Sequence, residues 1–280
     1  MTGRTTRKTP RVIRARLDAE LVRRGLARSR EQAAELVAAG RVTVNGEAAA
    51  KAATQVTRDT PILVSTDDGD PGYVSRGGHK LAGALAAFGD LTVAGRVALD
   101  AGASTGGFTD VLLRAGAAHV VAADVGYGQL AWSLQTDPRV TVRDRVNVRA
   151  LEPPQAAGPD GQRPSLVVGD LSFISLALVL PALVASADPD ADFVLMVKPQ
   201  FEVGKGRVGA GGVVRDPGLR GEAVTAVART AAELGLGVLG VTASPLPGPA
   251  GNVEYFVWLR RGAPPLDDED LRRAIAEGPH

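Results

Sequence analysis

The chain of 280 residues is 45% hydrophobic, has no cysteine and only three histidines, and carries a formal net charge of +1. Its length allows one large core and a small additional domain, while its composition excludes disulfides and thiolate chemistry and disfavours a histidine metal site. No apolar run approaches the roughly 20 residues of a membrane helix, and the basic N-terminus lacks the apolar core of a signal peptide, so we expect a soluble cytoplasmic protein that needs no metal.

The first 60 residues are basic, with 13 lysines and arginines against six acidic residues, whereas residues 61–280 have 19 against 25. A basic lobe on a mildly acidic body indicates attachment to a polyanion, although a solubilising basic tail would have the same charge. Residues 1–10 have no apolar face, and we expect a disordered tail there.

Two short helices followed by a hairpin are predicted over residues 11–65. Apolar residues at 17–22 supply the face of the first helix. Ser29 begins the second, with Gln32 three residues later in the pattern of a capping box. The dipeptide Asn45-Gly46 after the alternating stretch RVTV predicts a type I′ hairpin turn.

The stretch VRRGLARSREQAAELVAAGRVTVNG resembles the alpha-L type RNA-binding domain of a small-subunit ribosomal protein and of several RNA-modifying enzymes. The resemblance implies that arginines meet backbone phosphates while the helix pair fixes the register. A small helical domain with a solvated basic face is the alternative. The arginines that we assign to RNA on this basis are Arg14, Arg16, Arg23, Arg24, Arg28, Arg30 and Arg41.

Residues 66–74 are expected to form a linker, and residues 75–280 a second domain in which strand and helix patterns alternate. Most of the strands are continuous apolar runs, as in a sheet covered on both faces, and the alternation predicts a doubly wound α/β sheet. The seven predicted strands are 96–101, 119–125, 139–143, 165–171, 192–198, 236–242 and 252–259.

The first strand of this domain leads into the segment LDAGASTGGFTDVLL, with Asp100 at its carboxyl end. Ligands bind at that edge of open α/β sheets, and the glycines allow a ligand to approach the backbone. The spacing G-x-x-x-G-G counts against a dinucleotide fingerprint. Asp124 ends the next strand, where a carboxylate can accept both hydroxyls of a ribose. A nicotinamide cofactor is one candidate for such a site.

Four ionisable residues recur in the order Lys-Asp-Lys-Glu. Lys80 stands near the start of a helix before the first strand, Asp170 and Lys198 end the fourth and fifth strands, and Glu254 stands near the start of the seventh. A single such residue would more often be a strand-end charge that reaches solvent. Four of them are harder to explain in this way, and three would lie at the binding edge of the sheet if the strand order brings those strand ends together.

These motifs resemble the adenosylmethionine pocket of Rossmann-like methyltransferases and the catalytic tetrad of FtsJ-type 2′-O-ribose methyltransferases. Together with SRGGHKL, DVGYGQLAW, DLSFISL, VKPQFEVGKG, GGVVRDP and SPLPGPAGNVEYFVWL, they resemble the TlyA family of bacterial ribosomal RNA (cytidine-2′-O)-methyltransferases, sometimes labelled hemolysins, over residues 11–279. The implied fold is a Rossmann-like sheet of about seven strands, the last antiparallel, with a small N-terminal α+β domain.

The resemblance implies methylation of cytidine in small-subunit rRNA, and in actinobacterial members also in large-subunit rRNA. It makes Lys80, Asp170, Lys198 and Glu254 catalytic. It also implies that the glycine loop follows the methionine part of the cofactor, that Asp124 holds the ribose and that Asp144 lies near the adenine. The cofactor-binding residues assigned in this way are Asp100, Gly102, Ser104, Thr105, Gly106, Gly107, Phe108, Asp124 and Asp144.

The role of Lys198 has two interpretations. It is either a general base, with its pKa depressed by Lys80, or a charged group that steers the oxygen lone pair. In both cases Asp170 and Glu254 orient the lysines, and alignment of oxygen, methyl and sulfur supplies most of the gain.

Three further points remain open. An arginine expected in the linker of the closest relatives is replaced by Pro71, which puts any role of that charge in doubt. The glycine-rich stretch 204–214, with Lys205, Arg207 and the adjacent Arg215, is either an RNA contact or a solvated loop. The rival functions are a membrane-lytic protein and an RNA-binding regulator without catalysis, and a monomer is the expected state.

Overall fold

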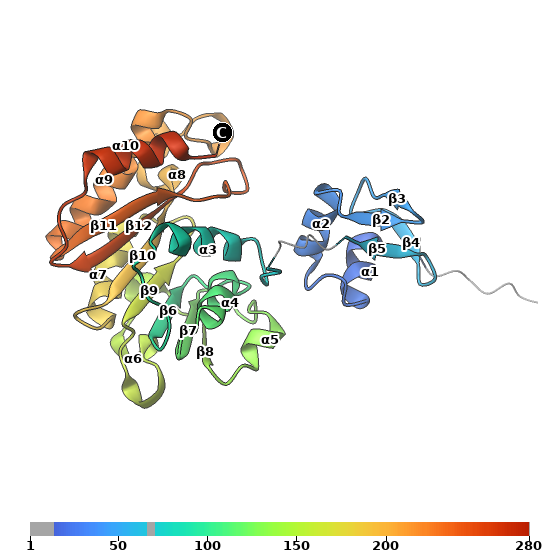
Figure 1. Cartoon of the computed structure of the whole chain (residues 1–280), viewed down its shortest axis with the longest axis horizontal. Coiled ribbons are helices and arrows are strands. Elements are labelled where there is room, and N and C mark those ends of the chain that lie inside the picture. Colours follow the sequence, from blue (N-terminus) through green and yellow to red (C-terminus); the bar gives the residue numbers. More distant parts are fainter. Residues whose placement is uncertain (1–13, 66–70, 280) are drawn as a thin grey trace, which may run out of the picture. The chain divides into compact units, whose positions relative to one another are not determined.

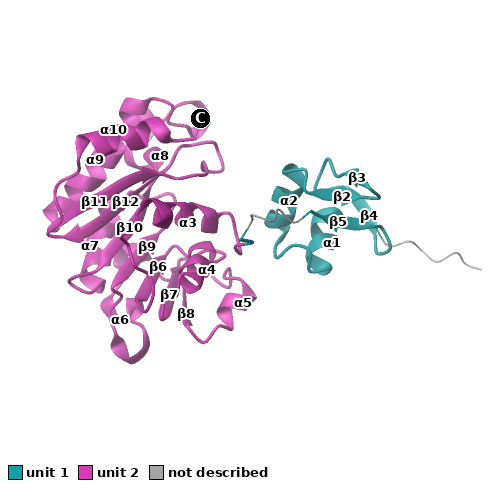
Figure 2. Ribbon diagram, viewed as in Figure 1, with its two compact units in different colours: residues 1–72 teal, residues 73–280 magenta. Residues whose placement is uncertain are grey.

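The computed structural model describes residues 14–65 and 71–279. The chain forms two compact units that divide between Gly72 and Tyr73, inside the stretch predicted as a linker (Figure 2). The predicted disordered tail, residues 1–10, lies outside the described residues.

The smaller unit is an α+β domain built from two helices and short antiparallel strands. One sheet has the order β3-β2-β5, and β1 pairs separately with β4. The helices pack on this framework through a core that includes Leu17, Leu21, Val37 and Val42. The elements are β1 (Arg14–Arg16), α1 (Leu17–Arg23), α2 (Arg30–Ala38), β2 (Val42–Val44), β3 (Glu47–Ala48), β4 (Gln55–Thr57) and β5 (Ile62–Val64).

Local sequence signals in this unit act largely as predicted. Asn45 and Gly46 both have positive φ, 53° and 85°, as a type I′ turn requires. The Ser29 hydroxyl accepts a hydrogen bond from the Gln32 N–H at 3.1 Å and so caps α2. The capping box itself is not closed, because the Gln32 side chain accepts from the N–H of Arg28 at 2.7 Å instead of that of Ser29.

The larger unit is a seven-stranded sheet with helices on both faces (Figure 1). Its elements are α3 (Gly77–Ala87), β6 (Val97–Ala101), α4 (Gly107–Arg114), β7 (His119–Asp124), α5 (Trp132–Gln135), β8 (Val140–Asp144), α6 (Pro153–Ala156), β9 (Leu166–Gly169), α7 (Leu176–Ser186), β10 (Asp192–Val197), α8 (Pro199–Glu202), α9 (Pro217–Glu233), β11 (Leu236–Ala243), β12 (Tyr255–Arg261) and α10 (Asp268–Glu277), with short 3₁₀ turns at Val148–Ala150, Pro159–Gly161, Lys205–Arg207 and Ala210–Gly212.

The strand order is β11-β12-β10-β9-β6-β7-β8. Strand β12 is antiparallel to both of its neighbours, β10 and β11, while the pairs from β10 to β8 are parallel. The predicted Rossmann-like methyltransferase sheet with an antiparallel last strand is therefore confirmed. The order also brings the carboxyl ends of β6, β7, β8, β9 and β10 to one edge.

Two apolar layers sandwich the sheet. Helices α3 and α4 pack on one face through residues such as Leu81 and Leu112, and α7 and α9 cover the other through residues such as Leu180 and Val227. All six residues of β10 are buried, as expected for a central strand with both faces covered. The rigid sheet fixes the residues that follow its carboxyl ends.

Candidate active site

Asp100 lies at the carboxyl end of the central strand β6 and is fully buried. One carboxylate oxygen accepts a hydrogen bond from the Thr109 hydroxyl at 2.6 Å. The other, Oδ1, has no hydrogen-bond partner among the described residues. Burial raises the pKa of Asp100 to about 7. An unpartnered acceptor at a ligand-binding edge suits a ligand that brings a donor or a positive charge.

The two outer acidic residues lie side by side at the same edge. Asp124 and Asp144 are register partners at the ends of β7 and β8. Asp124 accepts hydrogen bonds from the N–H groups of Ser104 at 2.8 Å and Gly126 at 2.7 Å, and Asp144 accepts from that of Gly128 at 3.0 Å. Asp124 thus joins the glycine loop to the next loop, and these bonds leave further lone pairs on both carboxylates.

The glycines of the loop are required mainly by packing. Gly106 has a φ of 96°, and a Cβ there would collide with the side chains of Leu130 and Leu134. A Cβ on Gly107 would collide with the Ser75 hydroxyl. At both positions protein atoms occupy the space that a Cβ would need, so packing by itself requires glycine there.

Three more of the predicted cofactor residues lie in this loop or directly after it, on the first turn of α4. Gly102 has a φ of 89°, and a Cβ there would press on Leu171 and on the carbonyl of Asp170. Thr105 accepts a hydrogen bond from the N–H of Ala131 at 3.1 Å through its carbonyl. The Phe108 side chain is buried in the core, so a cofactor can reach only its backbone.

The first ion pair of the predicted tetrad is deeply buried. Lys80, on the first turn of α3, contacts the Glu254 carboxylate at 2.5 Å, and both residues are less than 5% exposed. Glu254 directly precedes β12 instead of lying within it as predicted. Antiparallel β12 begins at the edge where β10 ends, with Tyr255 opposite Val197, and this placement brings Glu254 to the site.

The second ion pair is more open to solvent. Lys198 follows β10, and its Nζ lies 2.6 Å from Oδ1 of Asp170, whose side chain is 24% exposed. Its directed hydrogen bond goes to the Ser172 hydroxyl at 2.7 Å, so the contact with Asp170 is mainly coulombic. Each lysine thus has its own carboxylate, in keeping with the expectation that Asp170 and Glu254 orient the lysines.

Three residues near these pairs were missed by the sequence analysis. Gln200 donates a hydrogen bond from its side-chain amide to Glu254 at 3.4 Å. Ser172 contacts Lys198, and the next residue, Phe173, is 90% exposed with a φ of 65°. Their signal was their place within the motifs DLSFISL and VKPQFEVGKG, where only the charged residues stand out by side-chain type.

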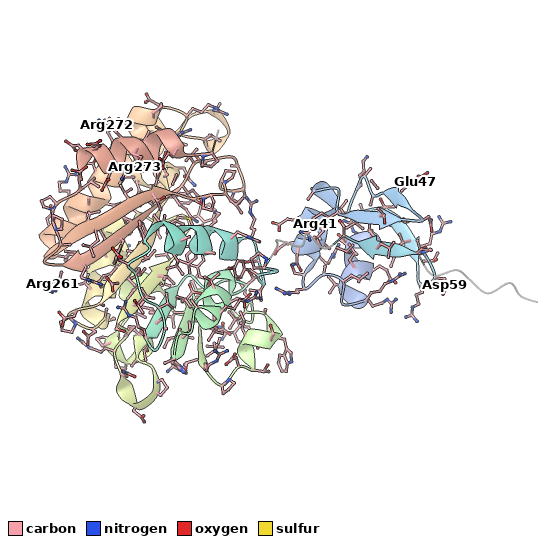
Figure 3. The ribbon with its side chains drawn as sticks, in the orientation of Figure 1. Arg41, Glu47, Asp59, Arg261, Arg272 and Arg273 are labelled. Carbon is pink, nitrogen blue, oxygen red and sulfur yellow. The ribbon has the colours of Figure 1, made fainter. Side chains whose placement is uncertain are left out.

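The predicted RNA-binding arginines differ in their surroundings. Arg16 and Arg30 contact Asp18, while Arg23 and Arg24 contact Glu20. Arg24 also donates to the carbonyls of Thr57, Arg58 and Thr60, which occupies most of its donors in holding the domain together. Arg14 and Arg28 are exposed, and Arg41 donates to the Ser65 carbonyl at 3.1 Å (Figure 3).

The glycine-rich stretch after α8 is held in part by the body of the domain. Arg207 pairs with Glu222 of α9 at 2.6 Å, and Arg215 donates to the Ala210 carbonyl at 3.3 Å. The buried Asn252 side chain binds the Gly212 carbonyl at 2.8 Å and the Val214 N–H at 2.9 Å. These contacts tie the stretch to the segment that carries Glu254.

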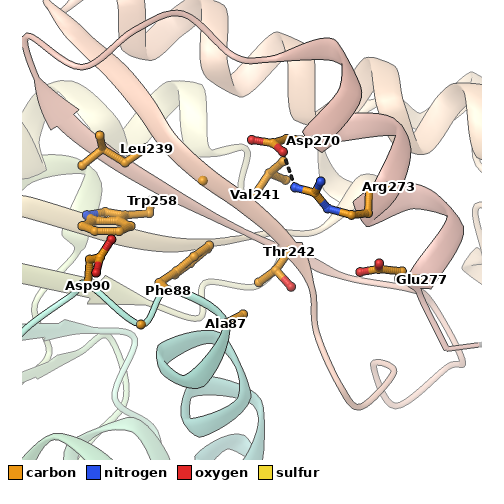
Figure 4. A pocket seen from close by; sticks show the side chains of 12 residues that line it. Ala87, Phe88, Asp90, Leu239, Val241, Thr242, Trp258, Asp270, Arg273 and Glu277 are labelled. Atoms are coloured by element: carbon orange, nitrogen blue, oxygen red, sulfur yellow. Dashed lines mark hydrogen bonds and ion pairs between the residues drawn. The ribbon is translucent and has the colours of Figure 1, made fainter.

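A separate cavity of about 300 Å³ lies between α3, β11 and α10 (Figure 4). The aromatic side chains of Phe88 and Trp258 line it, together with the carboxylates of Asp90 and Glu277. None of the predicted site residues lines it. The candidate active site is therefore defined by the strand ends and not by this cavity.

Comparison with known proteins gives the family. Residues 73–261 match the FtsJ-like methyltransferase family, and residues 15–62 match the S4 domain. The 16S/23S rRNA (cytidine-2′-O)-methyltransferase TlyA of Mycobacterium tuberculosis is 64% identical over 95% of this chain and 99% of its own. The chain belongs to the TlyA family. It is thus an adenosylmethionine-dependent methyltransferase with an N-terminal RNA-binding S4 domain.

Other TlyA-like relatives carry a different name. Hemolysin A of Brachyspira hyodysenteriae is 36% identical over 86% of this chain and 98% of its own. A solved structure from Streptococcus thermophilus, described as a candidate hemolysin, has a TM-score of 0.74 and 38% identity over 94% of this chain and 95% of its own. Among the helices of the described residues, none is long and apolar enough to cross a membrane.

The residues at the strand ends fit S-adenosylmethionine, the cofactor of this family. The ligand is a cation at its ammonium and sulfonium groups. Asp100 has a buried carboxylate oxygen that accepts no hydrogen bond within residues 14–65 and 71–279 and can therefore face positive charge. Asp124 and Asp144 provide neighbouring acceptors for hydroxyl and amino groups. The order of these carboxylates across β6, β7 and β8 suits one elongated ligand.

Proposed function

We propose that the protein methylates the ribose 2′-hydroxyl of cytidines in ribosomal RNA of both subunits. The observation that carries the proposal is the juxtaposition of two lysine–carboxylate pairs, Lys80–Glu254 and Lys198–Asp170, with the cofactor edge of the sheet. Cytidine and both subunits are inferred from the near full-length match with the 16S/23S enzyme. Such an enzyme works on ribosomal subunits in the cytoplasm, as a monomer, and the transfer requires no metal.

The two ion pairs have different parts in this reaction. S-adenosylmethionine supplies a methyl group on a positively charged sulfur. Lys198, held by Asp170 and Ser172, orients the 2′-oxygen for in-line attack. When the cofactor is bound, the 2′-hydroxyl would release its proton to the Asp170 carboxylate, because the Lys198 ammonium beside it has no lone pair to accept a proton. The Lys80–Glu254 pair is buried and has a supporting role: it holds its own side chains and that of Gln200 in place beside the site.

The cofactor would be held across three strand ends. We assign Asp100 to the positively charged part, the backbone of the loop Gly102–Gly107 to the methionine part, Asp124 to the ribose and Asp144 to the adenine. The supporting observations are the unpartnered oxygen of Asp100 and the adjacent register of the other two carboxylates.

The exposed aromatic side chains near the site suit an unpaired nucleotide. Phe173 follows Ser172, which contacts Lys198, and its ring lies 5.2 Å from that of Phe201. Tyr127 is 70% exposed beyond Asp124 and lies 4.4 Å from the Arg145 guanidinium. Aromatic and guanidinium planes stack on bases that have left a helix.

Methyl transfer to purified ribosomal subunits tests the function. Small and large subunits from a strain that lacks this gene are incubated with the protein and tritiated cofactor. Incorporation into rRNA of both subunits, with resistance of one cytidine in each to 2′-OH-dependent alkaline cleavage, is expected. Label in a base would refute 2′-O transfer, and absence of label from subunits and from free rRNA would favour a regulator without catalysis.

A further inference from the structure

Two acidic residues are buried within the most basic part of the S4 domain. Asp18 and Glu20 lie on α1 and are 4% and 2% exposed. Four arginines surround them, so the group has more positive than negative charge. Burying a carboxylate is costly unless it is paired and hydrogen-bonded, and both of these are.

Asp18 and Glu20 each accept several hydrogen bonds from arginine guanidinium groups. Arg16 forks onto Asp18 with Nε at 3.1 Å and Nη2 at 2.9 Å, and Arg30 adds a contact at 3.1 Å. Arg23 forks onto Glu20 with Nε at 2.7 Å and Nη2 at 2.6 Å. Hydrogen bonds from Arg23 and Arg24 lower the pKa of Glu20 to about 2, and those from Arg16 hold the pKa of Asp18 far below its usual range. Both acids are charged at neutral pH.

Three of the four arginines remain accessible to a ligand. The side chains of Arg16, Arg23 and Arg30 are 47%, 49% and 60% exposed, whereas that of Arg24 is 20% exposed. A guanidinium has five N–H donors, and the fork onto one carboxylate uses those of Nε and Nη2. Donors on Nη1 of Arg16 and Arg23 therefore remain for a second anion.

We propose that Asp18 and Glu20 are positioning residues for RNA, which hold Arg16, Arg30 and Arg23 in fixed directions for the phosphate backbone. An arginine that is already ordered loses less side-chain freedom when it binds phosphate. The inference rests on the proposed rRNA substrate and adds to it a requirement for negative charge. Removal of either acid makes the domain more positive, yet weakens its binding to RNA.

The test compares matched substitutions in the full-length protein, with a 16S rRNA transcript as the probe. Asp18→Asn keeps an Oδ1 acceptor for the Ala19 N–H, a bond of 2.8 Å, and so preserves the local backbone. Glu47→Gln is the control, because it makes the same change of charge at an exposed residue on β3, and none of the ion pairs described for this domain involves Glu47 (Figure 3). We expect Asp18→Asn and Glu20→Gln each to weaken binding about three- to tenfold, and Glu47→Gln to leave it unchanged or tighter. Equal effects of all three would overturn the inference.

A second experiment distinguishes a residue that positions arginines from one that only supports the fold. In the Arg16→Ala/Arg30→Ala protein, Asp18 has no arginine left to position, so Asp18→Asn should leave RNA affinity unchanged or raise it. A further loss of affinity in that background would show a merely structural role. Wild-type protein that binds rRNA, with Asp18→Asn equal to Glu47→Gln, contradicts only this inference. Wild-type protein that neither binds nor methylates rRNA contradicts the proposed function itself.

Discussion

Asp100 should make both stability and cofactor binding depend on pH. Its pKa is about 7 in the folded protein, against 3.8 for an ordinary aspartate. Between these values the folded protein keeps a proton that the unfolded chain has released, so the free energy of unfolding falls as pH rises from about 4 to 7. The full loss, on the order of 4 kcal/mol, persists above pH 7.

Asp100→Asn should remove this pH dependence, as measured by urea unfolding between pH 5 and pH 8. A cationic ligand beside Asp100 favours the carboxylate, so cofactor binding at pH 6 should release a proton in the wild type and not in the variant. Calorimetry in two buffers of different ionisation enthalpy measures that release. If the free energy of unfolding changed with pH in the same way in both proteins, Asp100 would be charged throughout this pH range.

Gly248 should be required for the position of Glu254. A Cβ at Gly248 would lie 2.6 Å from Glu254 Oε1 and 3.1 Å from its Cδ. Gly248→Ala should therefore displace the carboxylate that holds Lys80 and lower turnover about 100-fold, while cofactor affinity stays within twofold. Gly221→Ala is the matched control, because a Cβ there has open space. Normal turnover in Gly248→Ala would remove Glu254 from the catalytic group.

Lys198→Ala should abolish transfer while both ligands remain bound. Lys198 faces Asp170 and Ser172 at the end of a buried strand, so its loss removes transition-state stabilisation more than ground-state affinity. A decrease of about 10²–10⁴-fold is expected in single turnover at saturating cofactor. Lys198→Arg should restore little, because a guanidinium has a different shape. A surface lysine that merely caps β10 would give nearly wild-type rates in both variants.

At the scale of elements, the sequence allowed most strands of the larger unit to be placed to within about two residues at each end, because apolar runs and the charges after them are local signals. Asp124 is the last residue of β7 and Lys198 directly follows β10, close to the strand ends predicted for them. The partners of the four ionisable residues could not be predicted in this way. Insertion of β12 between β10 and β11 brings Glu254 to Lys80, 174 residues away, and sequence spacing contains no such information.

The opposite end of β10 carries a structural ion cluster. Asp192 is 1% exposed and accepts from Arg96 at 2.6 Å, from Arg260 at 2.7 Å and from the Trp258 indole at 2.7 Å. Asp192→Ala leaves these donors without their anion and should lower the free energy of unfolding by about 3–5 kcal/mol. Urea unfolding measures this loss, and Asp190→Ala, in the exposed turn before the strand, should have little effect. Transfer rates at low temperature should be normal, because the cluster lies at the end of the sheet remote from the site.

At the scale of the whole molecule, catalysis and RNA attachment are assigned to different units. The sheet, the ion pairs and the carboxylates of the cofactor edge all belong to residues 73–280, while the arginine-rich domain lies within residues 1–72. The first residues of the larger unit are fixed to it: the Val74 N–H donates to Asp110 at 2.9 Å, and the Arg114 guanidinium lies 5.0 Å from the Tyr73 ring. A protein that begins at Tyr73 keeps these contacts and should fold.

Deletion of residues 1–72 should therefore leave cofactor affinity within about twofold, measured by calorimetry, and abolish methylation of ribosomal subunits. Methylation should be lost because phosphate contacts from several arginines of the deleted domain supply affinity for rRNA. That affinity is electrostatic and falls steeply with salt. Full-length Lys198→Ala is the complementary control, because it should bind subunits with the salt dependence of the wild type and transfer nothing. Methylation by the truncated protein at the normal rate would place the RNA contacts on residues 73–280, with Arg207 and Arg215 as the first candidates. A truncated protein that loses cofactor binding as well would show that the S4 domain supports the cofactor edge and does more than capture rRNA.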